Sequence, residues 1–133
     1  MLALDPGSVR IGVAVSDPLG IIAQPHSSLD AEDPGILAAI VALGESLDID
    51  RVVVGLPLSL DGTEGAAAAL AREFADRVAG ATGFEVKLVD ERFSTVTAER
   101  TMIEAGVRRS ERKGARDRVA AAIFLQAHLD GLR

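Results

Sequence analysis

The sequence contains no cysteine, tryptophan or tyrosine, and its only aromatic residues are four phenylalanines. The absence of cysteine excludes disulfides, thiolate nucleophiles and cysteine-ligated zinc sites, and it fits a reducing cytoplasm. With so few aromatic residues, the core has to consist of Val, Ile, Leu and Ala. Any binding of nucleic acid would depend on contacts to the phosphate backbone, because the chain offers few rings on which bases could stack.

Long apolar stretches are absent as well. No run approaches the roughly 18 residues of a transmembrane helix, and the chain does not open on a basic segment followed by an apolar one, as a signal peptide would. We therefore expect no contact with a membrane and a cytoplasmic location. The length predicts one domain, residues 1–133. The sequence leaves both a monomer and a weak homodimer open.

The charge of the chain is unevenly distributed. Its net charge is −6, which taken alone disfavours a polyanionic ligand. Residues 108–118, RRSERKGARDR, nevertheless carry a charge of +4, so the rest of the chain sums to −10. We call this segment the basic strap, and it is typical of a site that contacts phosphates. Its basic residues are Arg108, Arg109, Arg112, Lys113, Arg116 and Arg118.

The first part of the chain predicts three short strands, at residues 2–4, 10–16 and 21–28, with Pro and Gly in the links between them. Because these links are short, neighbouring strands should be antiparallel. Pro25 cannot donate a hydrogen bond to a sheet, so the third strand should lie at an edge or in a turn.

The rest of the chain alternates between helical and strand patterns. Two further strands are expected, at residues 51–56 and 84–89. Four helices are expected. The first has Asp33 as N-cap and Pro34 as its first residue, and the second buries a face made of Ala67, Leu70, Ala71, Phe74 and Val78. The third runs from Ser94 or Thr95 to about Ala105, and the last begins near Ala115. This order predicts an α/β fold: an antiparallel meander followed by parallel strands in one mixed five-stranded sheet, with helices on both faces.

Three acidic residues fall where such a fold would bring them together. Asp5 follows the first strand and Glu91 follows the fifth, so both should lie at the carboxyl edge of the sheet, where ligands bind in open α/β folds. Asp117 lies in the first turn of the last helix, which could close over that edge. Asp90 competes with Glu91 for the same role. Each acid also has an ordinary structural explanation, for example Asp5 as a turn former before Pro6-Gly7.

Converging carboxylates repel one another, and a hard cation removes that repulsion. Mg²⁺ (or Mn²⁺) prefers a few carboxylates together with water and phosphate oxygens. One or two such ions could activate a water and stabilise the leaving oxygen of a phosphodiester. The basic strap, with Arg108, Arg109, Arg112, Lys113 and Arg116, would then bind the neighbouring phosphates as a loop that is mobile over residues 107–114 without substrate.

The sequence resembles the YqgF/RuvX family of ribonuclease H-like proteins, known as Holliday-junction-resolvase-like proteins and as nucleases of precursor ribosomal RNA. The matching stretches follow the family's order along nearly the whole chain. They are LALDPGSVRIGVAVSD at 2–17, VVVGLPLSLDGTEG at 52–65, VDERFSTVTAE at 89–99 and KGARDRVAAAIFLQ at 113–126. The resemblance implies a ribonuclease H-like fold and a metal-dependent nuclease whose acidic positions fall on Asp5, Glu91 and Asp117.

The chain departs from related resolvases in one respect. Those proteins carry an acid on the fourth strand, whereas this strand reads VVVGLP and has none. The second acid of the metal site would therefore have to come from the fifth strand.

The favoured function is a Mg²⁺-dependent nuclease, a hydrolase of phosphodiester bonds in structured nucleic acid. The resemblance points to the 5′ end of pre-16S ribosomal RNA as its substrate. Resolution of four-way DNA junctions and a non-catalytic RNA-binding role in ribosome assembly remain open. A nucleotide-binding phosphotransferase is a further alternative, because Asp5-Pro6-Gly7-Ser8 fits the first hairpin of actin-like folds. Those proteins need two such domains, however, and the chain has no Walker-type loop.

Overall fold

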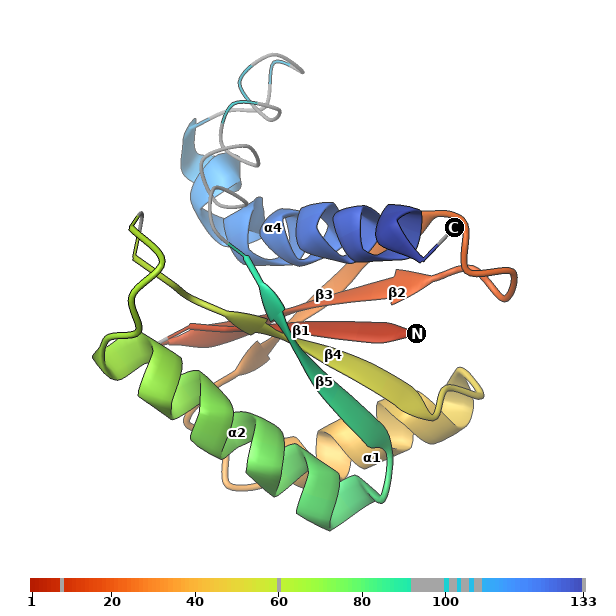
Figure 1. Ribbon diagram of the computed structural model, residues 1–133. Coiled ribbons are helices and arrows are strands. Elements are labelled where there is room, and N and C mark those ends of the chain that lie inside the picture. Colours follow the sequence, from red (N-terminus) through yellow and green to blue (C-terminus); the bar gives the residue numbers. More distant parts are fainter. Residues whose placement is uncertain are drawn as a thin grey trace.

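The computed structural model describes residues 1–7, 9–59, 61–91, 100, 103, 106 and 109–132, with the backbone alone for 109–117 (Figure 1). Five strands form one sheet in the order β3-β2-β1-β4-β5. The strands are β1 (Leu2–Pro6), β2 (Arg10–Ser16), β3 (Ala23–Asp30), β4 (Arg51–Leu56) and β5 (Glu85–Asp90). β1, β2 and β3 are antiparallel neighbours, and β4 is parallel to both β1 and β5. The predicted mixed sheet is therefore confirmed.

Helices cover both faces of this sheet, as predicted. Helices α1 (Ile36–Ser46) and α2 (Ala66–Thr82) lie on one face, and α4 (Arg109–Gly131) lies on the other (Figure 1). Among the helices of the described residues, none has the length and apolarity needed to span a membrane.

Alternation along the strands divides the core into two layers. Leu2 and Leu4 of β1 pack with the residues that face α1 and α2, whereas Ala3 between them packs with Leu125 and other residues of α4. Successive side chains of a strand point to opposite faces, so the next residue of β1 after Leu4 faces α4. That residue is Asp5.

The first and third strands differ from the prediction at their ends. β1 continues for two residues beyond Leu4, because Asp5 pairs with Gly12 and Pro6 with Ile11 of β2. Asp5 therefore lies inside the sheet instead of following it. β3 spans Ala23–Asp30 instead of 21–28, and it is an edge strand whose register shifts near Pro25, as expected for a residue that cannot donate to a ladder.

The predicted start of α1 and the predicted inner face of α2 are both wrong in detail. α1 begins at Ile36, because Asp33 accepts a hydrogen bond from the backbone N–H of Gly35 at 2.8 Å and so forms a turn before the helix. In α2, Leu70 is 67% exposed. Ala71, Phe74 and Val78 are buried as predicted. Ala68 and Ala75 take the places expected for Ala67 and Leu70, so the buried side is rotated slightly from the predicted one. The run of four alanines at 66–69 fits either rotation, so the sequence alone did not decide it.

The last helix begins earlier than predicted. α4 starts at Arg109, so residues 109–114, expected as a loop, are helical. Gly114 favoured the loop interpretation, but one glycine costs a helix only about 1 kcal/mol, and the surrounding Arg, Lys, Glu and Ala favour helix. The helix expected at 94–105 lies mostly outside the described residues. Gly106, predicted to end it, has a φ of +78° and donates to the carbonyl of Ile103 at 3.0 Å.

Candidate active site

Asp5 occupies an unusual position for a charged residue. It lies in β1, the central strand, and is only 7% exposed. Its neighbour in β2 is Gly12, and because Leu4 pairs with Val54, the next residue of β4 beside it is Gly55. Both neighbouring strands thus have a glycine, which has no side chain, beside this carboxylate on the face that α4 covers. A buried carboxylate is costly unless it is paired or coordinates a metal, so this position makes Asp5 a candidate ligand.

Glu91 reaches the same place from the end of β5. Its backbone N–H donates to the carbonyl of Leu56 at 3.3 Å, and its Oε2 atom is buried. A Cβ atom added to Gly55 would lie 2.5 Å from this Oε2 atom and 3.2 Å from Cε1 of Phe124 in α4. The Glu91 carboxylate therefore lies over Gly55, beneath α4. Asp5 and Glu91 share one face at the carboxyl edge, on either side of one glycine.

Asp90, the alternative to Glu91, is placed differently. It is the last residue of β5 and is exposed. Val89 before it packs against the core beneath α4, so alternation directs Asp90 to the opposite face. Of the two adjacent acids, Glu91 is the one near Asp5.

The third predicted acid is placed by its backbone alone. Residue 117 belongs to α4, seven positions before Phe124, so it lies on the same face of the helix two turns nearer its start. Leu129, near the other end of α4, lines a pocket with Met1, so the helix runs from the carboxyl edge of β1 toward its amino edge. The side chain of Asp117 and those of Arg109, Arg112, Lys113 and Arg116 are outside the described set, as is all of Arg108. Their roles remain predictions.

The described part of the site fits a divalent metal ion. Two carboxylates held together without a cation would repel each other, and their oxygens are the ligands that Mg²⁺ prefers. Among the described side chains no group of three or more His, Cys, Asp or Glu residues forms a metal site. A complete site would therefore draw on water, on substrate, or on residues such as Asp117.

A braced loop borders this edge of the sheet, and the sequence analysis did not predict it. Residues 57–59 and 61–65 follow β4, and a bridge joins Leu58 to Glu64. The Glu64 carboxylate accepts two hydrogen bonds from Arg72 of α2, at 2.6 and 2.9 Å. These bonds hold the pKa of Glu64 below its ordinary value and raise that of Arg72. The loop turns at Asp61-Gly62, where Gly62 has a φ of +87°.

Replacing Arg72 with methionine should loosen this loop without unfolding the protein, because both partners are exposed and exposed ion pairs contribute little to global stability. We expect faster amide hydrogen exchange at 58–64. Glu64 has a lowered pKa, so its stabilising effect is present above the ordinary carboxyl pKa and is lost as the pH falls through the lowered one. Parent and variant should therefore exchange alike at low pH. Equal exchange at neutral pH would contradict the brace.

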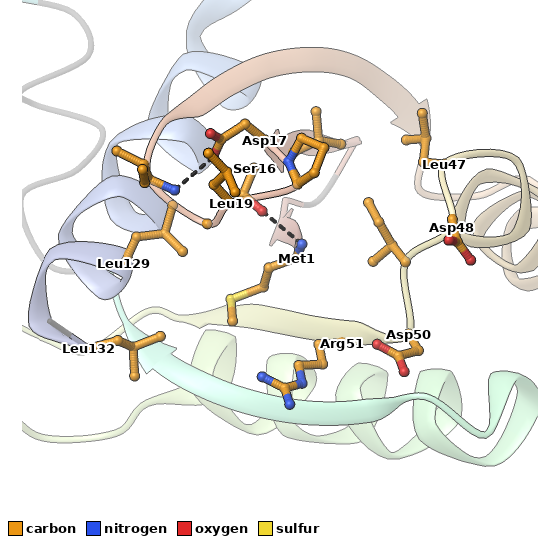
Figure 2. Close-up of a pocket in the computed structure, with 15 residues that line it drawn as sticks. Met1, Ser16, Asp17, Leu19, Leu47, Asp48, Asp50, Arg51, Leu129 and Leu132 are labelled. Carbon is orange, nitrogen blue, oxygen red and sulfur yellow. Dashed lines mark hydrogen bonds between the residues drawn. The ribbon is translucent and has the colours of Figure 1, made fainter.

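A pocket in the surface lies elsewhere. It has a volume of about 840 Å³ and opens at the amino ends of β1 and β4 (Figure 2), and neither Asp5 nor Glu91 lines it. Leu19, Leu47 and Leu132 line it, and the amino group of Met1 donates to Oγ of Ser16 at 2.7 Å. Burial lowers the pKa of this amino group. The pocket contains none of the predicted site residues.

The chain is similar in sequence and in fold to known proteins. Residues 1–131 match the family described as "RuvX: Holliday junction resolvase". Two relatives, each named "Putative pre-16S rRNA nuclease", come from Myxococcus xanthus (strain DK1622) and Halothermothrix orenii (strain H 168). The first is 45% identical and the match covers 99% of this chain and 88% of the relative, whereas the second is 42% identical with 98% and 94% covered.

Solved structures agree on the fold. RuvC from Thermus thermophilus superposes with a TM-score of 0.54 at 16% identity, covering 99% of this chain and 96% of that one. The same protein in complex with a Holliday junction substrate matches with the same TM-score.

These similarities define the class of the protein as a ribonuclease H-like nuclease domain with acidic residues at the carboxyl edge of its sheet. The chain belongs to the RuvX (YqgF) family, as the motifs of the sequence predicted.

Proposed function

We propose that this protein is a Mg²⁺-dependent (or Mn²⁺-dependent) nuclease that hydrolyses phosphodiester bonds in precursor 16S ribosomal RNA during ribosome biogenesis. The observation that carries the proposal is the placement of two acids on the face that α4 covers. Asp5 is buried in β1, and the buried Oε2 atom of Glu91 lies over the neighbouring Gly55 of β4. The names of the relatives support the substrate. Because precursor ribosomal RNA is made in the bacterial cytoplasm, the proposal implies that the protein acts there.

In this proposal Asp5 and Glu91 hold the metal, and Asp117 joins them from α4. A bound Mg²⁺ would supply Lewis-acid chemistry, polarising the phosphate and favouring ionisation of the attacking water. The protein keeps the two carboxylates in place before substrate arrives, because β1 and β4 fix the backbone beneath them.

Four-way DNA is the second candidate substrate, and the description of the matched family favours it. Cleavage assays with precursor 16S RNA, single-stranded RNA and four-way DNA, each in Mg²⁺ and in Mn²⁺, distinguish the two. We expect cleavage of the precursor RNA near its 5′ end. Preferential cleavage of the junction would reassign the substrate, and failure to cut any of the three while binding RNA would favour a non-catalytic assembly factor.

Neutralising Arg108, Arg109 and Arg112 of the basic strap should weaken binding of nucleic acid and flatten its salt dependence. The expected change is about one unit of the log–log slope for each lost phosphate contact. Fluorescence anisotropy over a salt series measures this slope, and calorimetry with Mn²⁺ should show unchanged metal binding.

A matched control removes the same amount of charge elsewhere. Arg51, Arg77 and Lys87 are exposed and lie outside the strap. Replacing these three with glutamine should leave the slope close to that of the parent. Equal slopes for both triple variants and the parent would show that the basic strap is exposed to solvent and does not contact phosphates.

A further inference from the structure

Gly55 interrupts an otherwise apolar strand. The other residues of β4 after Arg51 are Val52, Val53, Val54 and Leu56, all buried. A glycine inside a strand weakens it and often marks a close approach by another group. Gly55 is not among the described glycines with positive φ, so its backbone conformation does not require glycine. The reason for glycine here has to be space.

The space over Gly55 is occupied by Glu91. An added Cβ atom would lie 2.5 Å from Oε2 and 2.9 Å from Cδ of Glu91. Real Cβ atoms essentially never come this close to another heavy atom. Phe124 of α4, at 3.2 Å, closes the space from above and is itself buried. Because Oε2 is the far end of a flexible side chain, an introduced methyl group would displace the carboxylate from its place over Gly55.

The order of the strands shows why this space matters. Glu91 follows β5, Asp5 lies in β1, and β4 runs between these two strands. Neighbouring strands are about 4.8 Å apart, so β5 and β1 are separated by about 10 Å. A glutamate from the end of β5 can extend toward Asp5 only by crossing over β4, and a side chain on β4 at this level would block its path.

We infer that Gly55 is a positioning residue: by leaving its side of β4 empty, it lets Glu91 place its carboxylate beside Asp5. Glu91 thus occupies the space over β4 that an acidic side chain of that strand would otherwise fill. This inference rests on the proposed function, because it assumes that Asp5 and Glu91 bind one metal.

The test is a double-mutant cycle between Gly55→Ala and Glu91→Ala, read as the affinity for Mn²⁺ by titration calorimetry, with thermal unfolding as a check of folding. Gly55→Ala alone should weaken Mn²⁺ binding by about 10–100-fold, the range typical of losing a group that orients a metal ligand. In the Glu91→Ala background the same change should have no further effect on affinity. A purely structural role of Gly55 would lower the unfolding temperature and leave the affinity unchanged.

Gly80→Ala is the matched control. Gly80 lies in α2, and a Cβ atom added there meets nothing within 4 Å, so Mn²⁺ affinity should equal that of the parent. If Gly55→Ala does not fold but the double variant does, the clash with Glu91 is supported directly. If neither folds, the space serves Phe124 and the inference is wrong.

Parent-like Mn²⁺ affinity of Gly55→Ala would also overturn the inference while leaving the proposed function intact. The proposed metal site itself fails in a different way. In that case Asp5→Asn and Glu91→Ala would both bind Mn²⁺ as the parent does, or the parent would not bind it.

Discussion

Replacing Asp5 with asparagine should reduce metal-dependent cleavage by at least about 10²–10³-fold, the loss typical of removing a group that stabilises charge in the transition state. The protein should remain folded and be as stable as the parent or more so. Asparagine has nearly the same shape, and it removes a buried charge that lies near the Glu91 carboxylate. Cleavage rates at saturating Mg²⁺, together with denaturant unfolding, measure both effects.

Asp90→Asn is the matched control for this prediction. The two acids share the carboxyl edge of the sheet, but Asp90 is exposed and alternation directs it away from the face that α4 covers. Its replacement should leave the cleavage rate close to that of the parent. If Asp5→Asn cuts as fast as the parent, or unfolds, Asp5 is not the metal ligand that we propose.

The second large effect concerns the attachment of α4 to the sheet. Leu125 is fully buried and packs with Ala3, Ala14 and Val53 beneath the helix. Leu125→Ala should lower the free energy of unfolding by about 2–5 kcal/mol, because its small neighbours cannot fill the cavity. This is a large part of the roughly 5–15 kcal/mol that stabilises a typical domain. Urea unfolding followed by circular dichroism measures the change.

Leu70→Ala removes the same atoms from an exposed position. Leu70 is 67% exposed on α2, although the sequence pattern predicted it inside. Its replacement should change the free energy of unfolding by no more than about 0.5 kcal/mol. A cost similar to that of Leu125→Ala would mean that α2 buries the face predicted from the sequence and not the one described here.

The sequence by itself determined the order of the elements and the family. Periods of two and of 3.6 residues reflect burial within each element. They therefore predicted β2 and β4 with their observed bounds, and α1, α2 and α4 in the right order. The acid after the first apolar run and the acid after the fifth strand also led to Asp5 and Glu91. Local patterns of this kind suffice wherever one element alone fixes the preference.

Only the tertiary structure decided what depends on neighbouring strands and helices. The pairing of Asp5 with Gly12 made it a residue inside the sheet, since strand length is set by the partner as much as by the sequence. The rotation of α2 and the early start of α4 depend on packing, which outweighs weak propensities. The role of Gly55 is the clearest case. An isolated glycine in an apolar strand signals a close approach, but only the fold brings Glu91, 36 positions later in the chain, over it.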